Sequence, residues 1–239
     1  MRSLGVIGGL GPMATAYFLE LIVQMTDAKT DQEHLDVIVF NRPDVPDRTA
    51  YILGKSKDSP FEPMLRTAHT LETLGASCLA APCITSHCFY EDFQAAVRVP
   101  FLNMVAETVA HLKQNGVKRA GILATTGTIH TQLFQKELEK QGLEWVIPCE
   151  IGQEQVMHLI YNNVKAGQPV ELDRFELVSS KLREAGAECL ILGCTELSLI
   201  KRDYPVGPGC LDALEVLAQR SILTCGKPLK PNYQTLITQ

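Results

Sequence analysis

The chain contains an internal repeat, and this repeat limits the possible folds more than any other feature of its sequence. Segments 71–83 and 182–194 share a leucine, then the pattern Gly-Ala-x-Cys-Leu, and each ends on a second cysteine. A glycine-bounded segment recurs at nearly the same spacing, in 5–11 and in 121–127. We therefore predict two α/β lobes of similar structure, each built around one copy of the repeat.

Short apolar runs alternate with helical patterns along the chain. Continuously apolar strands between helices are typical of parallel sheets that are covered on both faces. The expected fold class is α/β, with two pseudo-symmetric lobes, each a mostly parallel sheet flanked by helices, and the active site in the interlobe cleft. The first lobe is expected to hold residues 1–100 and the C-terminal helix at about 208–228, and the second 101–207. Strands are expected at 4–7, 36–40, 78–81, 120–124 and 189–192, and helices at 12–24, 64–74, 107–114, 130–140, 154–165, 174–184 and 211–223.

The composition is that of a globular protein, with 46% hydrophobic and 21% charged residues. The net charge of −5 argues against a partner that is a nucleic acid or a membrane surface. No apolar run is long enough for a membrane span and no signal-peptide pattern is present, so the cytoplasm is the expected location. The eight cysteines are therefore expected to be thiols, and without CxxC pairs or neighbouring histidines they predict no metal site.

Two of these cysteines, Cys83 and Cys194, follow the repeated strands. Open α/β sheets form their sites at the carboxyl ends of strands, and two-fold-related lobes would direct both thiols into one cleft. Cys78 and Cys189 precede them at an odd spacing, which predicts the opposite strand face and a place in the core. Inverting a carbon stereocentre needs a base on one face and an acid on the other. Thiols, with an ordinary pKa near ~8.5, can fill both roles.

Residues typical of helix starts follow both thiols, Thr85-Ser86 in the first lobe and Thr195-Glu196 in the second. A helix N-terminus can lower a thiol pKa and bind a carboxylate. The sequence therefore favours a site for an anionic substrate between the lobes.

Taken together, several segments resemble the cofactor-independent aspartate/glutamate racemases, and the aspartate racemase branch most closely. The resemblance covers nearly the whole chain. It implies a racemase that works without pyridoxal phosphate or any other cofactor, acts on a dicarboxylic amino acid and forms a homodimer. The matching segments are 8–12 with 14–15, 46–55, 82–83 with Thr85 and His87, 123–128, 164–167 and 193–196.

The resemblance also implies a role for individual residues. Cys83 and Cys194 are the expected acid/base thiols. Arg48 and Lys165 are similar to the residues that bind the side-chain carboxylate of the substrate. The other expected substrate contacts are Gly11, Ile84, Thr85, Thr126, Gly127, Thr128, Thr195 and Glu196, with Thr126 and Thr128 at the α-carboxylate.

One residue departs from the family pattern, because Ile84 stands where the family has an asparagine that contacts the substrate. An isoleucine cannot replace that hydrogen bond, which is worth ~0.5–1.5 kcal/mol. The leading hypothesis is therefore racemisation of aspartate, with glutamate second. Two alternatives remain: isomerisation or decarboxylation of another small carboxylic acid on the same scaffold, and weak or absent turnover in a protein that binds acidic metabolites.

The first glycine-rich turn has a competing interpretation. Gly9, Gly11 and Ala14 fit the dinucleotide fingerprint G-x-G-x-x-A. Asp36, the acid at the right distance, is expected to begin the second strand rather than end it, and Pro12 lacks an N–H that a phosphate would use. We therefore expect the glycines to permit a close approach to the substrate.

Four other residues also have two readings. Arg48 could be a solvated loop residue, and Lys165 could satisfy the last carbonyls of a helix. His87, about one turn after Cys83, could tune that thiol or be a satisfied structural histidine. Glu196 could orient groups around Cys194 or cap its helix.

Overall fold

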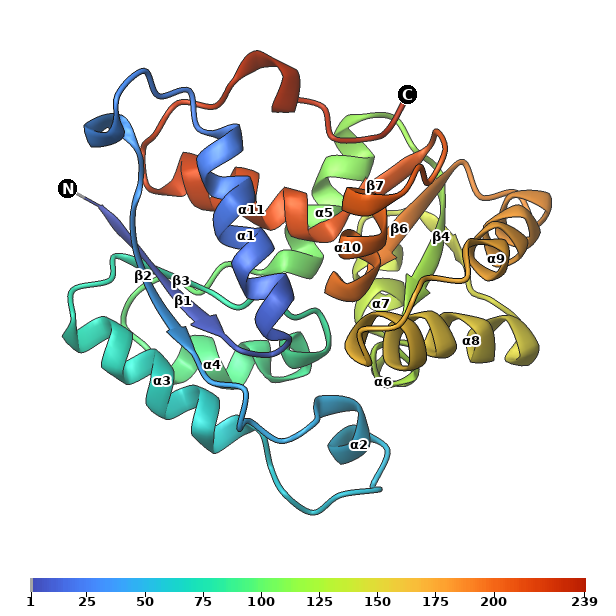
Figure 1. The fold of residues 1–239 in the computed structure, drawn as a ribbon, viewed down its shortest axis with the longest axis horizontal. Coiled ribbons are helices and arrows are strands. Elements are labelled where there is room, and N and C mark those ends of the chain that lie inside the picture. Colours follow the sequence, from blue (N-terminus) through green and yellow to red (C-terminus); the bar gives the residue numbers. More distant parts are fainter. Residues whose placement is uncertain (1) are drawn as a thin grey trace.

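Each copy of the repeat forms a parallel sheet in the computed structural model, which describes residues 2–239 (Figure 1). The first sheet has the order β2-β1-β3 and the second β5-β4-β6-β7, and every pair of neighbours is parallel. The fold class predicted from the sequence is confirmed. The strands are β1 (Ser3–Gly8), β2 (Asp36–Asn41), β3 (Cys78–Ala80), β4 (Arg119–Ala124), β5 (Glu144–Val146), β6 (Cys189–Gly193) and β7 (Cys210–Asp212).

The two copies have the same strand register. Leu4 of β1 is paired with Cys78 of β3, and Ala120 of β4 is paired with Cys189 of β6. The next residues along, a glycine and a leucine, are paired in both sheets. The repeat seen in the sequence is therefore a repeat of structure.

The repeated glycines, Gly5 and Gly121, have the same neighbours in both lobes. A Cβ atom added at Gly5 would lie 2.7 Å from Leu79, and one at Gly121 would lie 2.6 Å from Leu190. The added Cβ would also lie 2.8 to 3.3 Å from an alanine and a second leucine of each repeat, which are Ala76 and Leu71 at Gly5, and Ala187 and Leu182 at Gly121. Only a glycine therefore lets helix α3 (Phe61–Thr73) or α9 (Leu172–Glu184) pack closely on its strand.

The core divides into one shared part and one outer part in each lobe. Side chains from one face of each sheet join α1 (Pro12–Met25), α5 (Met104–Gln114) and α11 (Ala213–Thr224) in a shared cluster, while the opposite faces pack in separate clusters. Cys78 and Cys189 lie in the shared cluster. Cys83 and Cys194 lie in the outer clusters, as their odd spacing from the other two predicts.

Helix α11 packs against α1 and α5 and also contacts a strand of each sheet, β3 and β6. In Figure 1 it crosses the middle of the molecule between the two lobes. The helix expected at 211–223 begins only at Ala213, because Cys210–Asp212 pair with β6 as the edge strand β7. The division of the chain at residue 100 stays a prediction.

The remaining helices differ from the expected ones at two places. The helix expected at 130–140 is two helices, α6 (Thr126–Thr131) and α7 (Leu133–Lys140), because Gln132 between them is left-handed with φ 57°. The helix expected at 154–165 is α8 (Glu150–Met157), which continues as a π-helix (His158–Lys165). The other helices are α2 (Arg48–Ile52), α4 (Tyr90–Ala96) and α10 (Thr195–Asp203), with 3₁₀ turns at Asp31–Glu33, Thr85–Phe89 and Pro231–Tyr233.

Within residues 2–239, none of the helices combines the length and the apolar character that crossing a bilayer requires.

Candidate active site

Both lobes contribute to a small buried chamber that contains Cys83 and Cys194. Each of these cysteines is only 6% exposed. The chamber has a volume of about 10 Å³, which is room for roughly one water molecule. Its lining residues are Leu10, Asp47, Arg48, Thr49, Cys83, Ile84, Thr85, Thr125, Tyr161, Lys165, Cys194, Thr195 and Glu196.

Cys194 directly follows β6 and is the N-cap residue of α10. Its Sγ donates a hydrogen bond to Glu196 Oε2 at 2.9 Å. Burial, together with the negative charge of Glu196, raises the pKa of Cys194 well above its ordinary value, against the opposite effect of Lys165. The raised pKa favours the thiol form of Cys194, which is hydrogen-bonded to the Glu196 carboxyl group.

Cys83 lies in the loop between β3 and the first turn of the following 3₁₀ helix. Its carbonyl oxygen accepts hydrogen bonds from Ser86 Oγ at 2.7 Å and from His87 Nδ1 at 2.9 Å. His87 Nε2 accepts from the backbone N–H of Met104 at 3.1 Å, so both ring nitrogens are used. Burial lowers the pKa of His87 and keeps its ring neutral. These contacts make His87 a structural histidine that holds the Cys83 loop.

Arg48 is buried at the start of α2, with only 7% of its surface exposed, so the solvated-loop reading is wrong. Three of its five N–H groups donate to backbone carbonyls, two to Val45 and Pro46 and one to Leu10. Its Nε has no partner among the described residues. Burial opposes the charge, but Cys83 and Asp47 favour it and raise the pKa of Arg48. Arg48 is thus a fixed cation beside Cys83 at the chamber.

Lys165 ends the π-helix and points across the chamber. Its Nζ lies 3.7 Å from Glu196 Oε1, 3.9 Å from Asp47 Oδ2 and 4.7 Å from the centre of the Tyr161 ring. Burial opposes its charge, but Glu196 and Cys194 outweigh burial and raise its pKa. Lys165 therefore connects acidic groups of both lobes, which a lysine that only satisfied helix carbonyls would not do.

The threonines expected at the site lie at different depths. Thr85, Thr125 and Thr128 form a buried triangle of hydroxyl groups, with oxygen–oxygen distances of 3.0 to 3.1 Å. Thr85 and Thr125 line the chamber, whereas Thr128 lies behind them. Thr126 instead lines a separate cleft between α2 and α8.

The expected glycines and Ile84 also have defined places. A Cβ added at Gly127 would lie 3.0 Å from the Thr49 hydroxyl, and one at Gly11 would lie 3.0 Å from Glu196 Oε1. Both glycines therefore permit close contact between the lobes. Ile84 lines the chamber but also packs in the shared core.

Five chamber residues were missed as site residues in the sequence: Leu10, Asp47, Thr49, Thr125 and Tyr161. Asp47 caps α2 by accepting from the Ala50 N–H at 2.8 Å, and it also accepts from the Tyr161 hydroxyl at 3.1 Å. Tyr161 precedes Lys165 by four residues, a spacing that places two side chains on one helix face. That spacing was the available signal for Tyr161.

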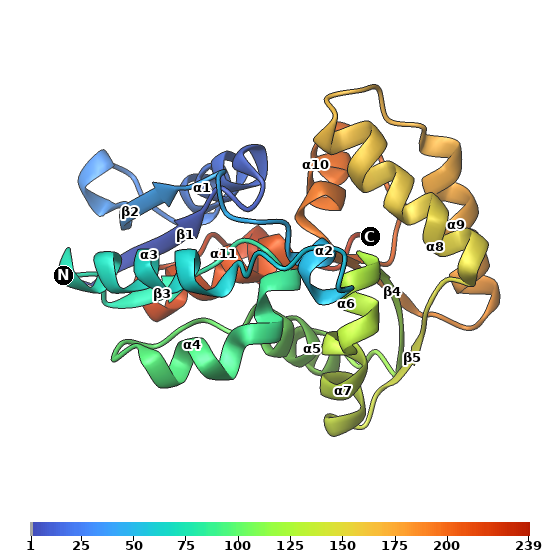
Figure 2. The ribbon, with the colours of Figure 1, turned by 90° about the horizontal axis from the view of Figure 1, so that it is seen from below.

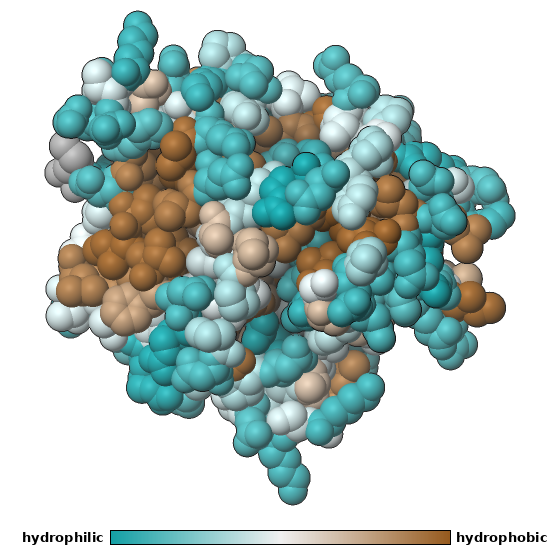
Figure 3. Space-filling model, viewed as in Figure 1, coloured by the Kyte–Doolittle hydropathy of each residue, from teal (hydrophilic) through white to brown (hydrophobic). Residues whose placement is uncertain are grey.

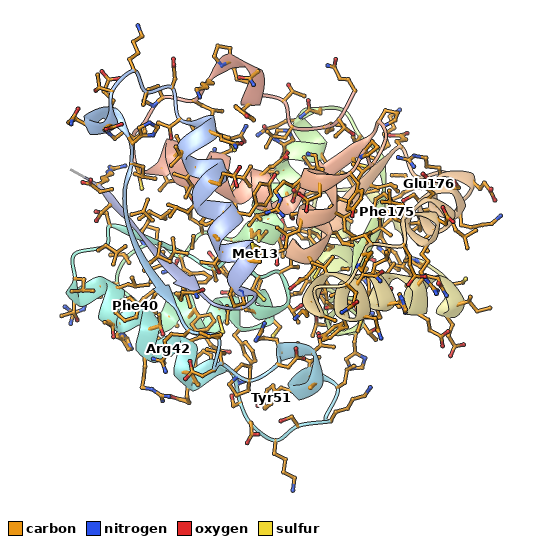
Figure 4. All side chains as sticks on the ribbon, viewed as in Figure 1. Met13, Phe40, Arg42, Tyr51, Phe175 and Glu176 are labelled. Atoms are coloured by element: carbon orange, nitrogen blue, oxygen red, sulfur yellow. The ribbon has the colours of Figure 1, made fainter. Side chains whose placement is uncertain are left out.

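A larger cleft of about 760 Å³ adjoins the chamber between α1 and the π-helix. Leu10, Asp47, Arg48, Lys165 and Glu196 line both spaces and separate them. Met13 of α1, labelled in Figure 4, lies at this cleft. Figure 2 shows α2, which carries Arg48, beside α6 of the second lobe, against which it packs. The cleft between α2 and α8 also adjoins the chamber, because Asp47, Thr49 and Tyr161 line both.

Thiols, carboxyl groups and cations line the chamber, and such groups can exchange protons with a bound molecule. Among residues 2–239, no three His, Cys, Asp or Glu side chains are grouped as a metal site would require. A Cβ at Gly9 would lie 2.3 to 2.5 Å from the backbone of Arg42, so Gly9 lets the loops after β1 and β2 lie close together.

Two buried thiols, one after each copy of the repeat, thus line one chamber, and comparison with known proteins gives the class as racemases. The chain belongs to the Asp/Glu/Hydantoin racemase family, which it matches over residues 7–220. It is therefore an isomerase.

Individual relatives agree with this assignment. The chain is 26% identical to the broad specificity amino-acid racemase RacX of Bacillus subtilis over 232 residues, which are 92% of this chain and 97% of that protein. It is 30% identical to the structure of Picrophilus torridus aspartate racemase, with a TM-score of 0.85 and 99% of both chains covered. The glutamate racemase of Francisella tularensis shares the fold at 17% identity, with a TM-score of 0.65 over 93% of this chain and 80% of the other.

Proposed function

We propose that the protein interconverts the L and D forms of aspartate, with glutamate as second substrate, by proton transfer between Cys83 and Cys194 and without a cofactor. The observation that carries the proposal is that one buried thiol from each repeat lines a single chamber with Arg48 and Lys165. Arg48 and Lys165 supply the positive charge that the side-chain carboxylate of an acidic amino acid requires. The charge environments of the thiols differ, since Cys83 has Arg48 beside it and Cys194 has Glu196.

In this mechanism the substrate is held by its carboxylates with its α-carbon between the sulfur atoms. The Cys83 thiolate takes the α-proton from one enantiomer, which leaves a carbanion stabilised by the cations. The Cys194 thiol then donates its proton to the opposite face, which gives the other enantiomer and a Cys194 thiolate. The reverse reaction exchanges the two roles. Glu196 accepts the Cys194 hydrogen bond between turnovers and keeps that thiol oriented.

The test is proton NMR of L- and D-aspartate, then L- and D-glutamate, with the enzyme in D2O under reducing conditions. Loss of the α-proton signal together with appearance of the other enantiomer is the expected result. If neither signal changes for any of the four compounds, this form of the proposal is wrong.

A second candidate is racemisation of larger or neutral amino acids. Ile84 presents an apolar surface in the chamber, and the adjoining cleft has room for a longer side chain. The relative from Bacillus subtilis is described as having broad specificity. The same NMR assay with leucine, methionine and lysine separates the two candidates, because only the second gives faster exchange with these than with aspartate.

Glu196→Gln is expected to make Cys194 ionise at a lower pH. The Glu196 charge helps burial to raise the pKa of Cys194, so a neutral glutamine removes part of the shift. In a Cys83→Ala background, the pH profile of Cys194 alkylation by iodoacetamide should move to lower pH. Glu150→Gln, at the edge of a separate cleft, is the matched control. An unchanged profile in Glu196→Gln would contradict the assigned contact.

We also propose that the protein is a homodimer that pairs through α1 and β2. Leu19 and Val23 are 39% and 49% exposed on α1, and β2 is an edge strand of its sheet beside partly exposed Val37 and Val39. Figure 3 shows the resulting apolar surface on the first lobe. Such patches are typical of interaction sites. Light scattering should give twice the chain mass, and Val23→Glu should give monomers. Leu177→Glu, at an exposed leucine of α9, should stay dimeric.

The cytoplasmic location stays a prediction.

A further inference from the structure

A buried hydrogen bond links the helix that carries Cys194 to the start of α11. Ser198 Oγ of α10 donates to Asp212 Oδ1 at 2.7 Å, and both residues are 0% exposed. The same Oδ1 accepts from the Leu214 N–H at 2.8 Å, so Asp212 also caps α11. Ser198 lies about one helical turn after Cys194, and its N–H donates to the Cys194 carbonyl at 3.4 Å. The link therefore acts on the first turn of α10, where the thiol is held.

This link is not the most stable way to join two helices. Asp212 Oδ2 has no hydrogen-bond partner among the described residues, and burial raises the pKa of Asp212. A buried polar atom without a partner is destabilising, and apolar packing of similar volume is often as stable or more so. A hydrogen bond, unlike apolar packing, has a preferred distance and direction. The Ser198–Asp212 bond thus restricts how α10 can rotate or slide along α11.

Because α10 is bonded to α11, the contacts of α11 determine how α10 is placed relative to the first lobe. Helix α11 packs against α1 of the first lobe and contacts β3, the strand that leads to Cys83. One turn beyond Ser198, Lys201 Nζ lies 2.6 Å from Glu215 Oε2 of α11, with both side chains nearly buried. The two links together connect the Cys194 helix to the part of the core that both lobes share.

We propose that Ser198 and Asp212 are positioning residues that hold Cys194 opposite Cys83 for proton transfer. The inference rests on the two-thiol racemisation proposed above. Its consequence is specific, because loss of the link displaces Cys194 and leaves Cys83 in place. The Cys83 thiolate then still removes the α-proton of one enantiomer, exchanges that proton with solvent and returns a deuteron to the same face. Delivery from the opposite face by Cys194 fails, so exchange continues while inversion slows.

The experiment compares the two rates in Ser198→Ala. Loss of the α-proton in D2O is measured by NMR, and inversion is measured by chiral chromatography of the same samples. We expect inversion to fall by about 10-fold or more, as misplacement of a reacting group predicts. For one enantiomer, α-proton exchange should fall much less. Ser221→Ala is the matched control, since Ser221 is equally buried and bonds only within α11, to the Leu217 carbonyl.

Two variants of Asp212 separate positioning from general stability. Asp212→Asn keeps the acceptor for Ser198 and Leu214, so it should keep the wild-type ratio of exchange to inversion even where its melting temperature falls. Asp212→Ala removes the acceptor and should shift the ratio as Ser198→Ala does. Melting curves show whether each variant is folded. If Asp212→Ala is unfolded, the comparison of Ser198→Ala with Ser221→Ala decides the question.

Two results would overturn the inference. In the first, Ser198→Ala has the wild-type ratio of exchange to inversion. In the second, exchange of both enantiomers falls together with inversion, which marks a general structural defect. A different result, wild-type enzyme that exchanges no α-proton from any amino acid tested, refutes the proposed function itself and this inference with it.

Discussion

Replacing Cys83 or Cys194 with alanine is expected to lower racemisation by about 10²- to 10⁴-fold, the range typical of a lost acid–base group. Each variant keeps only one of the two thiols in the chamber, so neither can both remove and deliver a proton across the α-carbon. Chiral chromatography of aspartate or glutamate measures the loss. In D2O, each variant should still exchange the α-proton of the one enantiomer whose proton faces the remaining thiol.

Cys189→Ala is the matched control for these two variants. Cys189 belongs to the same repeat as Cys194 and is also buried, but it faces the shared core and does not line the chamber. Its loss should lower the melting temperature and leave turnover per folded molecule unchanged. Turnover close to wild type in Cys83→Ala or Cys194→Ala would exclude a two-thiol mechanism and favour chemistry that needs a single cysteine.

Arg48→Ala is expected to lower kcat/KM by about 100-fold, mainly through a higher KM. Hydrogen bonds to a charged group contribute ~1.5–3 kcal/mol, and about 1.4 kcal/mol is a factor of ten. The variant also leaves carbonyls of Leu10 and Pro46 without their donor, so its melting temperature should fall. Arg48→Lys should recover little, because one ammonium group cannot bind three carbonyls and a carboxylate together.

Arg42→Ala is the control, since Arg42, labelled in Figure 4, lies in the loop between β2 and the helix α2 that begins with Arg48. Its guanidinium pairs with Asp44 on the surface, with 47% of the side chain exposed. Steady-state kinetics of this variant should match wild type within about two-fold, as exposed ion pairs contribute little. Equal losses in the Arg42 and Arg48 variants would show that the effect is not specific to the site.

Most of the fold could be predicted because local patterns carry it. Each long strand is a continuous apolar run, and the glycines that follow the helices mark where those helices end. The two strands that were missed, β5 and β7, have three residues each and include a charged residue, so neither is a continuous apolar run like β3. The break at Gln132 was also missed, because a left-handed glutamine has no sequence signal comparable to a glycine.

Some features of the site could likewise be predicted from local sequence patterns, and others could not. The repeat places Cys83 and Cys194 at equivalent points of equivalent strands, so the sequence could predict that both line one chamber. The capping contact of Asp47, the hydroxyl triangle around Thr125 and the link between Cys194 and Glu196 depend on side-chain directions in loops and first helical turns. Those directions follow from packing across the lobes, which spacing along one segment does not encode.

The sequence by itself determined that two similar lobes each contribute one thiol to a common site. A repeated hydrophobic pattern produces the same strand register twice, and an odd spacing decides which cysteine of each pair leaves the core. Only the tertiary structure decided that Arg48 is held by three carbonyls, that Cys194 is a thiol bonded to Glu196, and that α11 links the Cys194 helix to the first lobe. The physical reason is that burial and hydrogen bonding at the chamber arise between segments far apart in the chain, which become neighbours only when the two lobes close on a shared core.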